Sequence, residues 1–488
     1  METTENASSA DNLRRAIIDR SVKGPVLFMF ANAALWLLAS TILGLLSSVK
    51  LFAPGFLDFT FLNYSRIQPA HIDTLVYGWA MQAGMGVMLW LAARRSRQEL
   101  RAGRAALVIG VIFWNIGITL GVLGLLFGYS TSIQWLEFPA YVWPLLIGPF
   151  LLVAYRVIVF FVTSQREGGF MVSSWYLLGA SFWFPWIILT TIFFTFPGWF
   201  SGNGALAAGV DAWYISSTIL LFFVPVGLGA CYYFVPKITG QPIKSSQLAK
   251  LGFWGLAIMA GWTGMQKYMG GPLPTWMPAI GGMVMILLLV PAGLVGLNFH
   301  VSSEGKRNLI QSSPTLRFVF AGSFGYLVTA GVGALISTFW TGSLLQFTYA
   351  EYGYHLVAIY GFFSMTIFGA IYYIVPRLAG CEWLSSRMIR NHFWFSVYGI
   401  SALVVCSLVG GLAQGSALND PQHWNESVVG AVRDSQGYVV GRTLAWAFIL
   451  WSNGWFFVHL VFMVLGLGRR SVAPTLLHHE DDHAPTAA

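Results

Sequence analysis

The sequence predicts an all-α membrane protein with twelve transmembrane helices. Of its 488 residues, 56% are hydrophobic and only 9% are charged, whereas about 25% are charged in an average soluble domain. So few charged residues do not cover the surface of a soluble protein, and the surplus apolar residues therefore require a lipid phase. The 53 glycines and 21 tryptophans are typical of closely packed membrane helices and of aromatic rings at membrane interfaces.

Twelve apolar runs are long enough to cross a bilayer, which takes about 20 residues per helix. They are Val26–Leu46, Thr74–Ala93, Ala106–Phe127, Tyr141–Val162, Val172–Phe196, Trp213–Val235, Leu251–Tyr268, Trp276–Phe299, Phe318–Trp340, Tyr354–Val375, Phe393–Leu412 and Thr443–Leu467. A polar stretch, Asn419–Gly441, separates the last two runs. We therefore expect a single membrane domain over residues 1–488, without soluble modules.

The basic residues predict the orientation of these helices. With a cytoplasmic N-terminus, 22 of the 27 basic residues fall on the cytoplasmic side, and only Lys50, Arg66, Lys267, Arg433 and Arg442 do not. This distribution obeys the positive-inside rule and places both termini in the cytoplasm. Residues 1–25 form the expected N-terminal segment and residues 469–488 a disordered tail. Because the basic residues lie in short loops, the net charge of +8 indicates orientation and not nucleic-acid binding.

Buried polar side chains are the first functional candidates, because they are costly at membrane depth. His71 and His355 both fall at the outer start of an outside-to-inside helix, which predicts a similar depth for the two. Histidines from two helices at one depth suit bis-imidazole haem ligation; the alternative is two helix-cap histidines. His300 and His392 suit helix caps and His459 a structural hydrogen bond. The other four histidines lie in the outer loop or the tail.

Six short motifs follow one another along the chain. They are Gln68-Pro69-Ala70-His71, Leu136-Glu137-Phe138-Pro139, Trp213-Tyr214, Trp262-x-Gly264, Leu273-Pro274-x-Trp276 and Tyr372-Tyr373-Ile374-Val375-Pro376-Arg377. In order and spacing they resemble subunit I of the cbb3-type cytochrome c oxidases, members of the haem–copper oxidase superfamily, and the helix count agrees. The resemblance implies that His71 is a low-spin haem ligand and that Arg442 lies near the haem propionates.

The sequence departs from this family at its redox centres. Ser216, Gln266 and Lys267 stand where the family has three copper-ligating histidines, Ala260 where it has a redox tyrosine, and Tyr354 where it has the high-spin haem histidine. A hydroxyl, an amide and an ammonium do not replace three neutral imidazoles as copper ligands. We therefore expect no copper and no oxygen reduction. The Lys267 ammonium is expected to pair with Glu351 or Asp211, since an unpaired charge at depth is costly.

The low-spin haem depends on His355. It lies one residue before the position of the family's second ligand, which turns it about 100° around the helix. A one-residue bulge would restore its direction, and such bulges are frequent at functional sites; otherwise His355 is an interfacial histidine. The expected cofactor is one low-spin haem b held by His71 and His355.

These features favour a degenerate oxidase subunit I that passes electrons within a larger respiratory complex of the bacterial inner membrane. A membrane-anchored cytochrome c-type subunit or other respiratory subunits are the expected partners, beside the lipid bilayer. Two alternatives are a haem-free membrane scaffold for a cytochrome-bearing partner and a terminal oxidase with unconventional ligands. An optical spectrum separates the three: one low-spin haem, no haem, or two haems of which one binds carbon monoxide.

Overall fold

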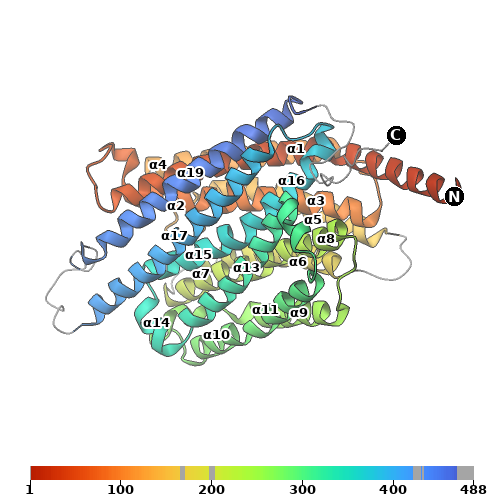
Figure 1. Cartoon of the computed structure of the whole chain (residues 1–488). Helices are drawn as coiled ribbons and strands as arrows, with labels where there is room; N and C mark the ends of the chain where they lie inside the picture. Colours follow the sequence, from red (N-terminus) through yellow and green to blue (C-terminus); the bar gives the residue numbers. More distant parts are fainter. Residues whose placement is uncertain (1, 165–170, 197–203, 421–429, 431–432, 470–488) are drawn as a thin grey trace.

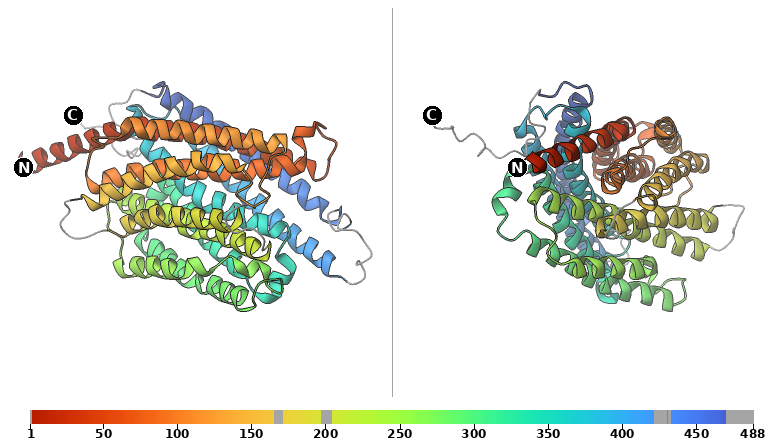
Figure 2. Two further views of the ribbon diagram at one scale, coloured as in Figure 1. Left: turned by 180° about the vertical axis from the view of Figure 1, so that it is seen from behind. Right: turned by 90° about the vertical axis from the view of Figure 1, so that its right-hand side faces the viewer.

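The computed structural model describes residues 2–164, 171–196, 204–420, 430 and 433–469. Over these residues the fold is an all-α bundle of long helices, as the composition predicts, with one isolated β-bridge between Glu382 and Arg469. The helices run side by side, and the N-terminal end of α1 lies at the same end of the bundle as the C-terminal end of α19 (Figure 1). Figure 2 shows the same bundle from behind and along its long direction.

The helices follow in chain order. The first half comprises α1 (Glu2–Lys50), η1 (Thr60–Leu62), α2 (Tyr64–Asp73), η2 (Thr74–Met81), α3 (Gln82–Ser96), α4 (Arg104–Phe127), η3 (Ala140–Val142), α5 (Trp143–Val162), α6 (Val172–Thr195), α7 (Gly204–Thr218), η4 (Ile219–Phe223) and α8 (Val224–Thr239). The second half comprises α9 (Ser246–Met259), η5 (Ala260–Trp262), η6 (Met265–Tyr268), α10 (Trp276–Leu287), α11 (Leu289–Ser302), α12 (Arg307–Ser312), α13 (Pro314–Ile336), α14 (Phe339–Leu345), α15 (Tyr349–Leu356), η7 (Val357–Ser364), α16 (Met365–Ala379), α17 (Ser386–Asn419) and α19 (Gln436–Val464).

Eleven helical runs among the described residues are long and apolar enough to cross a membrane. The one predicted span that is not among these runs is Leu251–Tyr268, the seventh in chain order. Its α-helix ends at Met259, and the chain continues as the short 3₁₀ turns η5 and η6. Gly264 lies between these turns at φ +109°, a conformation that only glycine adopts without strain. The seventh predicted span is therefore a broken helix.

Three of the helical runs occupy the centre of the bundle. The apolar windows of Tyr64–Ser96 and Tyr349–Ala379 are 100% buried and that of Gly204–Thr239 is 94% buried, against 39–50% for the other eight. Each central run contains a π-helical segment near its middle, namely η2, η4 and η7. Such widened turns are frequent at functional sites, and all the candidate haem and copper positions except those near Gly264 and Arg442 lie on these runs.

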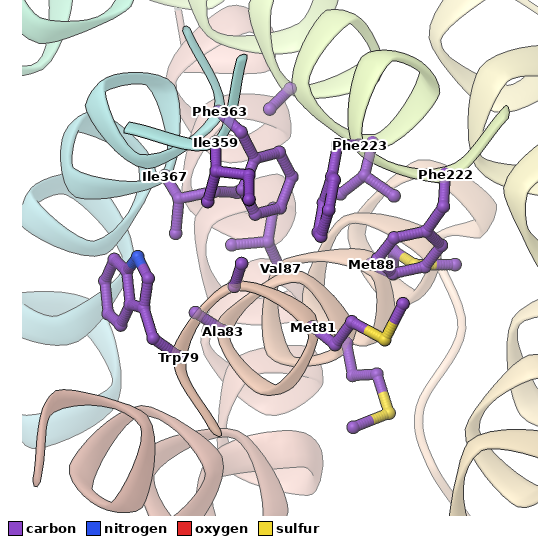
Figure 3. Close-up of a cluster of buried hydrophobic side chains, with 14 of the residues drawn as sticks. Trp79, Met81, Ala83, Val87, Met88, Phe222, Phe223, Ile359, Phe363 and Ile367 are labelled. Carbon is purple, nitrogen blue, oxygen red and sulfur yellow. The ribbon is translucent and has the colours of Figure 1, made fainter. Parts of the chain in front are cut away.

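The middle of the core is apolar. Figure 3 shows side chains of the three central runs converging there, among them Trp79, Phe223, Ile359 and Phe363. The rings of Phe223 and Phe363 lie 4.8 Å apart between centroids. Trp79 is fully buried, and its indole N–H donates to Ser364 Oγ over 2.7 Å. These contacts hold the three runs together near their middles, while His71 and His355 lie closer to the N-terminal ends of their runs.

Two of the remaining histidines have structural contacts. His459 Nε2 accepts a hydrogen bond from the Ser385 backbone N–H at 3.4 Å, which confirms the structural hydrogen bond expected for it. His392 is fully buried and lies 2.8 Å from the Tyr372 hydroxyl through Nδ1. His423 and the tail histidines lie outside the described residues.

Candidate functional site

His71 is fixed near the N-terminal end of the first central run, Tyr64–Ser96. It is fully buried on α2, and its Nδ1 lies 2.8 Å from the Ser40 carbonyl of α1. Because a carbonyl only accepts, Nδ1 carries the proton and Nε2 is left as an acceptor. Gly44, one turn further along α1, lies so close that an added Cβ would be 2.7 Å from the imidazole Cε1. Ser40 and Gly44 therefore set the direction of the imidazole.

The group that faces His71 Nε2 is the hydroxyl of Tyr352. The two atoms are 3.2 Å apart, so the hydroxyl donates to the free ring nitrogen. Trp446 of α19 closes the site from another side, with its ring edge-on to the imidazole at 4.9 Å and 88°. The sequence analysis gave neither residue a role, since aromatic side chains are common throughout this chain.

Arg442 lies beside the same tyrosine. It is 5% exposed on α19, and its guanidinium stands 5.1 Å from the ring centroid of Tyr352 and 5.2 Å from that of Tyr349. Its Nε donates to Ser48 Oγ over 3.3 Å. The structure therefore brings His71 and Arg442 together through Tyr352, consistent with the neighbourhood implied by the family resemblance.

His355 does not join this group. It lies three residues after Tyr352, which places it about 4.5 Å further along the helix axis. Its ring packs edge-on against Trp135 at 5.1 Å. The π-helical segment η7 begins at Val357, after His355, and His355 lines a cavity with Ser216 and Lys267, to which His71 does not contribute. No hydrogen bond or ring contact joins the two histidines, whose contacts are with other residues.

The positions aligned with the copper ligands are tied to other protein groups. Ser216 Oγ lies 2.7 Å from Thr263 Oγ1. Gln266 Oε1 accepts from the backbone N–H of Gly264 over 2.6 Å. Neither side chain is therefore directed at an open coordination site.

Lys267 pairs with Glu351, as the sequence analysis expected, and its ammonium also donates to Gln134 Oε1 over 2.9 Å. With Ser216, His355 and Tyr354 these residues line a cavity of about 50 Å³. The donors here are a hydroxyl, an amide, an ammonium and the single imidazole of His355, and they do not match a set of three imidazoles for a copper ion. For haem, His71 offers one oriented imidazole, but Tyr352 holds its free nitrogen and the second imidazole is directed elsewhere. The residues as arranged do not provide two axial imidazoles to one haem.

A pair of carboxyl groups lies next to this site and was not singled out from the sequence. Asp73, two residues after His71, is fully buried and accepts from the Phe138 backbone N–H over 3.0 Å. The carboxyl of Glu137, in the outer loop before α5, lies beside it. Burial of the Glu137 carboxyl and repulsion from Asp73 raise its pKa well above its ordinary value. In the sequence, Glu137 lies in one of the motifs and Asp73 follows another by two residues, which does not reveal that the two carboxyl groups meet.

Comparison with known proteins identifies the family of this chain. The family model described as cytochrome c and quinol oxidase polypeptide I matches residues 24–447. The cbb3-type cytochrome c oxidase subunit CcoN1 of Stutzerimonas stutzeri is 26% identical over 395 residues, which cover 78% of this chain and 82% of that protein. A cytochrome c oxidase subunit 1 homolog of Agrobacterium tumefaciens (strain T37) is 24% identical over 417 residues, 83% of this chain and 74% of that protein.

A solved structure of a heme-copper terminal oxidase dimer has the same fold. It aligns with a TM-score of 0.71 over 92% of this chain and 86% of that chain, at 14% sequence identity. The family model spans most of the sequence, and the bundle has the helices that such a protein requires. The chain is therefore a multi-pass membrane protein that belongs to the family of subunit I of the haem–copper oxidases.

Proposed function

We propose that this chain is an oxidase-family membrane subunit that does not reduce oxygen at a haem–copper centre of its own. The observation that carries the proposal is the set of contacts at the copper-ligand positions. Ser216 is hydrogen bonded to Thr263, and Gln266 to a backbone amide. Lys267 is paired with Glu351, and its positive charge opposes a second cation. Copper prefers imidazole and thiolate ligands, and this pocket offers a single imidazole, that of His355, in place of the family's three histidines.

A haem-free scaffold is the form of this function that the contacts of His71 support best. Tyr352 donates to Nε2, the only ring nitrogen left to bind iron. His355 packs against Trp135 and not across from His71. An iron atom on His71 would require Tyr352 to leave and His355 to turn. In this proposal the family's fold is kept as a membrane platform for a partner subunit that carries the redox group.

The second candidate is a subunit with one low-spin haem b and no copper. It is supported by the Ser40 carbonyl that orients His71, because metal-ligating histidines usually donate their other ring N–H in this way. In this form His71 and His355 would hold the haem, and Arg442 would lie near its propionates. The haem, when bound, would supply one-electron transfer to a neighbouring subunit.

The partners proposed for either form are a membrane-anchored cytochrome c-type subunit or other respiratory subunits. The location proposed is the bacterial inner membrane with both termini in the cytoplasm. The bacterial relatives that are named as oxidase subunits support both proposals, and so does the distribution of basic residues.

The optical spectrum of the purified protein, with metal analysis, tests the function. We expect no stoichiometric haem and no copper. One low-spin b-type haem that binds no carbon monoxide would instead establish the second candidate, and then His71→Ala and His355→Ala should each abolish the spectrum. Two haems, one of which binds carbon monoxide, together with stoichiometric copper, would overturn the proposal that the chain does not reduce oxygen.

A further inference from the structure

A cavity of about 940 Å³ lies at the end of the bundle where α1 begins. Three parts of the chain line it: Arg14 and Ile18 of α1, the connection from α3 to α4, and the last turns of α5. Four arginines contribute to its walls, Arg14, Arg97, Arg101 and Arg156, together with one acidic residue, Glu99. Its volume lies in the range of small-molecule binding sites, about 300–1,000 Å³.

Local structure holds the walls of this cavity in place. Arg97 ends α3 in the left-handed region at φ +56°, and its carbonyl accepts from Arg14 Nη2 over 3.2 Å. Gln98 binds Thr163 twice, donating to its carbonyl over 2.6 Å and accepting from its hydroxyl over 2.9 Å. The α3–α4 connection is therefore tied to α1 on one side and to the end of α5 on the other.

The fourth arginine, Arg156, is held against the same connection. An added Cβ on Gly103 would come within 2.1 Å of its Nη2. Gly103 itself has φ +82°, so both its backbone and the guanidinium packed on it require glycine. Arg156 Nε is buried and has no hydrogen-bond partner among the described residues.

The positive charge of this cavity is only partly balanced, because Glu99 is the single acidic residue beside its four arginines. Two neighbouring arginines outside it are paired, Arg15 with Asp11 and Arg94 with Asp19. By contrast, the four that line the cavity have no carboxylate within 4 Å in the part of the chain that the structure describes. The positive-inside rule requires only that basic residues be numerous on one side; it does not require four guanidinium groups around one cavity.

We propose that this cavity binds a phosphate-bearing anion, and that the anion is the headgroup of an acidic phospholipid. Arginine presents a planar fork of donors that matches phosphate oxygens. Basic pockets between membrane helices on the cytoplasmic side recognise such headgroups.

The neighbouring surface favours a lipid over a soluble phosphate compound. On α1, Leu13 and Ile17 flank Arg14 and are 65% and 43% exposed. On α5, Tyr155 and Val162 are 56% and 72% exposed, which suits contact with acyl chains. The cavity therefore lies where a phosphate group and its hydrocarbon chains are accommodated together.

The test compares two triple variants of the full-length protein in detergent. The cavity variant is Arg14→Gln/Arg97→Gln/Arg101→Gln. The control variant, Lys250→Gln/Arg387→Gln/Arg390→Gln, removes the same charge from the predicted cytoplasmic side outside the cavity. Native mass spectrometry measures retention of cardiolipin, which carries two phosphates, against phosphatidylcholine. Isothermal titration with inorganic pyrophosphate measures binding of a soluble phosphate compound.

We expect the wild-type and control proteins to retain cardiolipin, and the cavity variant to bind it about a hundredfold more weakly. Pyrophosphate binding that is lost in the cavity variant, without lipid retention, would keep the phosphate site but identify a soluble ligand. Equal loss in both triple variants, or no loss in either, would overturn the proposal. If the cavity variant does not fold, Arg101→Gln alone, on the exposed connection, should weaken binding about fivefold, and an unchanged affinity would also overturn it.

Discussion

At the scale of single residues, Tyr352 is the centre of the group formed by His71, Tyr352 and Arg442. Its hydroxyl faces His71 Nε2 at 3.2 Å and its ring lies 5.1 Å from the Arg442 guanidinium. An imidazole whose Nδ1 is already bonded to a carbonyl needs a donor at Nε2, because an unpaired buried acceptor costs about 1–3 kcal/mol. Tyr352 supplies that donor, and this contact is the main difference between the haem-free and haem-bound proposals.

Tyr352→Phe tests this contact. The substitution keeps the ring beside Arg442 but removes the donor to His71, so we expect a loss of about 1–3 kcal/mol of stability, measured as a lower thermal midpoint in detergent. Tyr349→Phe is the matched control, since its ring also stands beside Arg442. If iron occupies His71 Nε2, the two variants should be equally stable, and the scaffold form would be abandoned.

The carboxyl of Glu137 predicts a pH dependence of stability. Its pKa is raised in the folded protein by burial and by Asp73, so folding favours the protonated form. This contribution is present at low pH and is lost as the pH rises through the raised pKa. Glu137→Gln should therefore stabilise the protein at alkaline pH, by on the order of 1 kcal/mol, and flatten the profile of thermal midpoint against pH. Asp58→Asn, an exposed acid, should leave the profile unchanged; a steeper profile in Glu137→Gln would contradict the assignment.

At the scale of elements, the break in the helix after α9 decides the geometry of the cavity lined by Ser216, Gln266 and Lys267, the positions aligned with the family's copper ligands. The Thr263 hydroxyl binds Ser216, and the Gly261 carbonyl accepts from the Trp213 indole over 2.8 Å. Gly264 lets this segment approach α7 closely, because an added Cβ would lie 2.5 Å from the Ala212 carbonyl oxygen. The break therefore allows backbone and side chains to fill the space where the resemblance places a metal.

Gly264→Ala should be strongly destabilising for two reasons. Its φ of +109° is unfavourable for alanine, and its Cβ would meet the backbone of α7. We expect a loss of at least about 2 kcal/mol, seen as a lower thermal midpoint. Gly240→Ala is the control, with φ +68° but nothing within 4 Å of its added Cβ, and should cost about 1 kcal/mol. Similar midpoints for the two variants would show that the close approach to α7 is not important.

At the scale of the whole molecule, three central runs are surrounded by the other helices. The contrast between 94–100% and 39–50% burial separates the helices that carry His71, Tyr352 and His355 from those that face lipid. The central runs pack through apolar residues such as Phe223 and Phe363 (Figure 3), and this packing does not depend on the residues at the positions aligned with the family's redox ligands.

The orientation of the bundle is tested by cysteine labelling. After replacement of Cys231, Cys381 and Cys406, a single cysteine is introduced as Gln241→Cys or as Asp58→Cys, both exposed positions. A membrane-impermeant maleimide should label the Asp58→Cys protein in intact spheroplasts and the Gln241→Cys protein only after the membrane is opened. The opposite pattern would refute the inside location of both termini.

The sequence by itself determined the fold class, the family and most of the spans. Apolar runs of about 20 residues have few alternatives to transmembrane helices, because backbone polar groups must be satisfied within the segment. It also predicted that Ser216, Gln266 and Lys267 depart from copper ligation, which stays a prediction, and that Lys267 has a carboxylate partner, which the structure identifies as Glu351. Tertiary structure decided which side chains meet. The break at Gly264 depends on a close approach to another helix, and the direction of His355 depends on packing against Trp135. The partner of His71 comes from a helix 281 residues away in sequence, so no local pattern in the sequence encodes it.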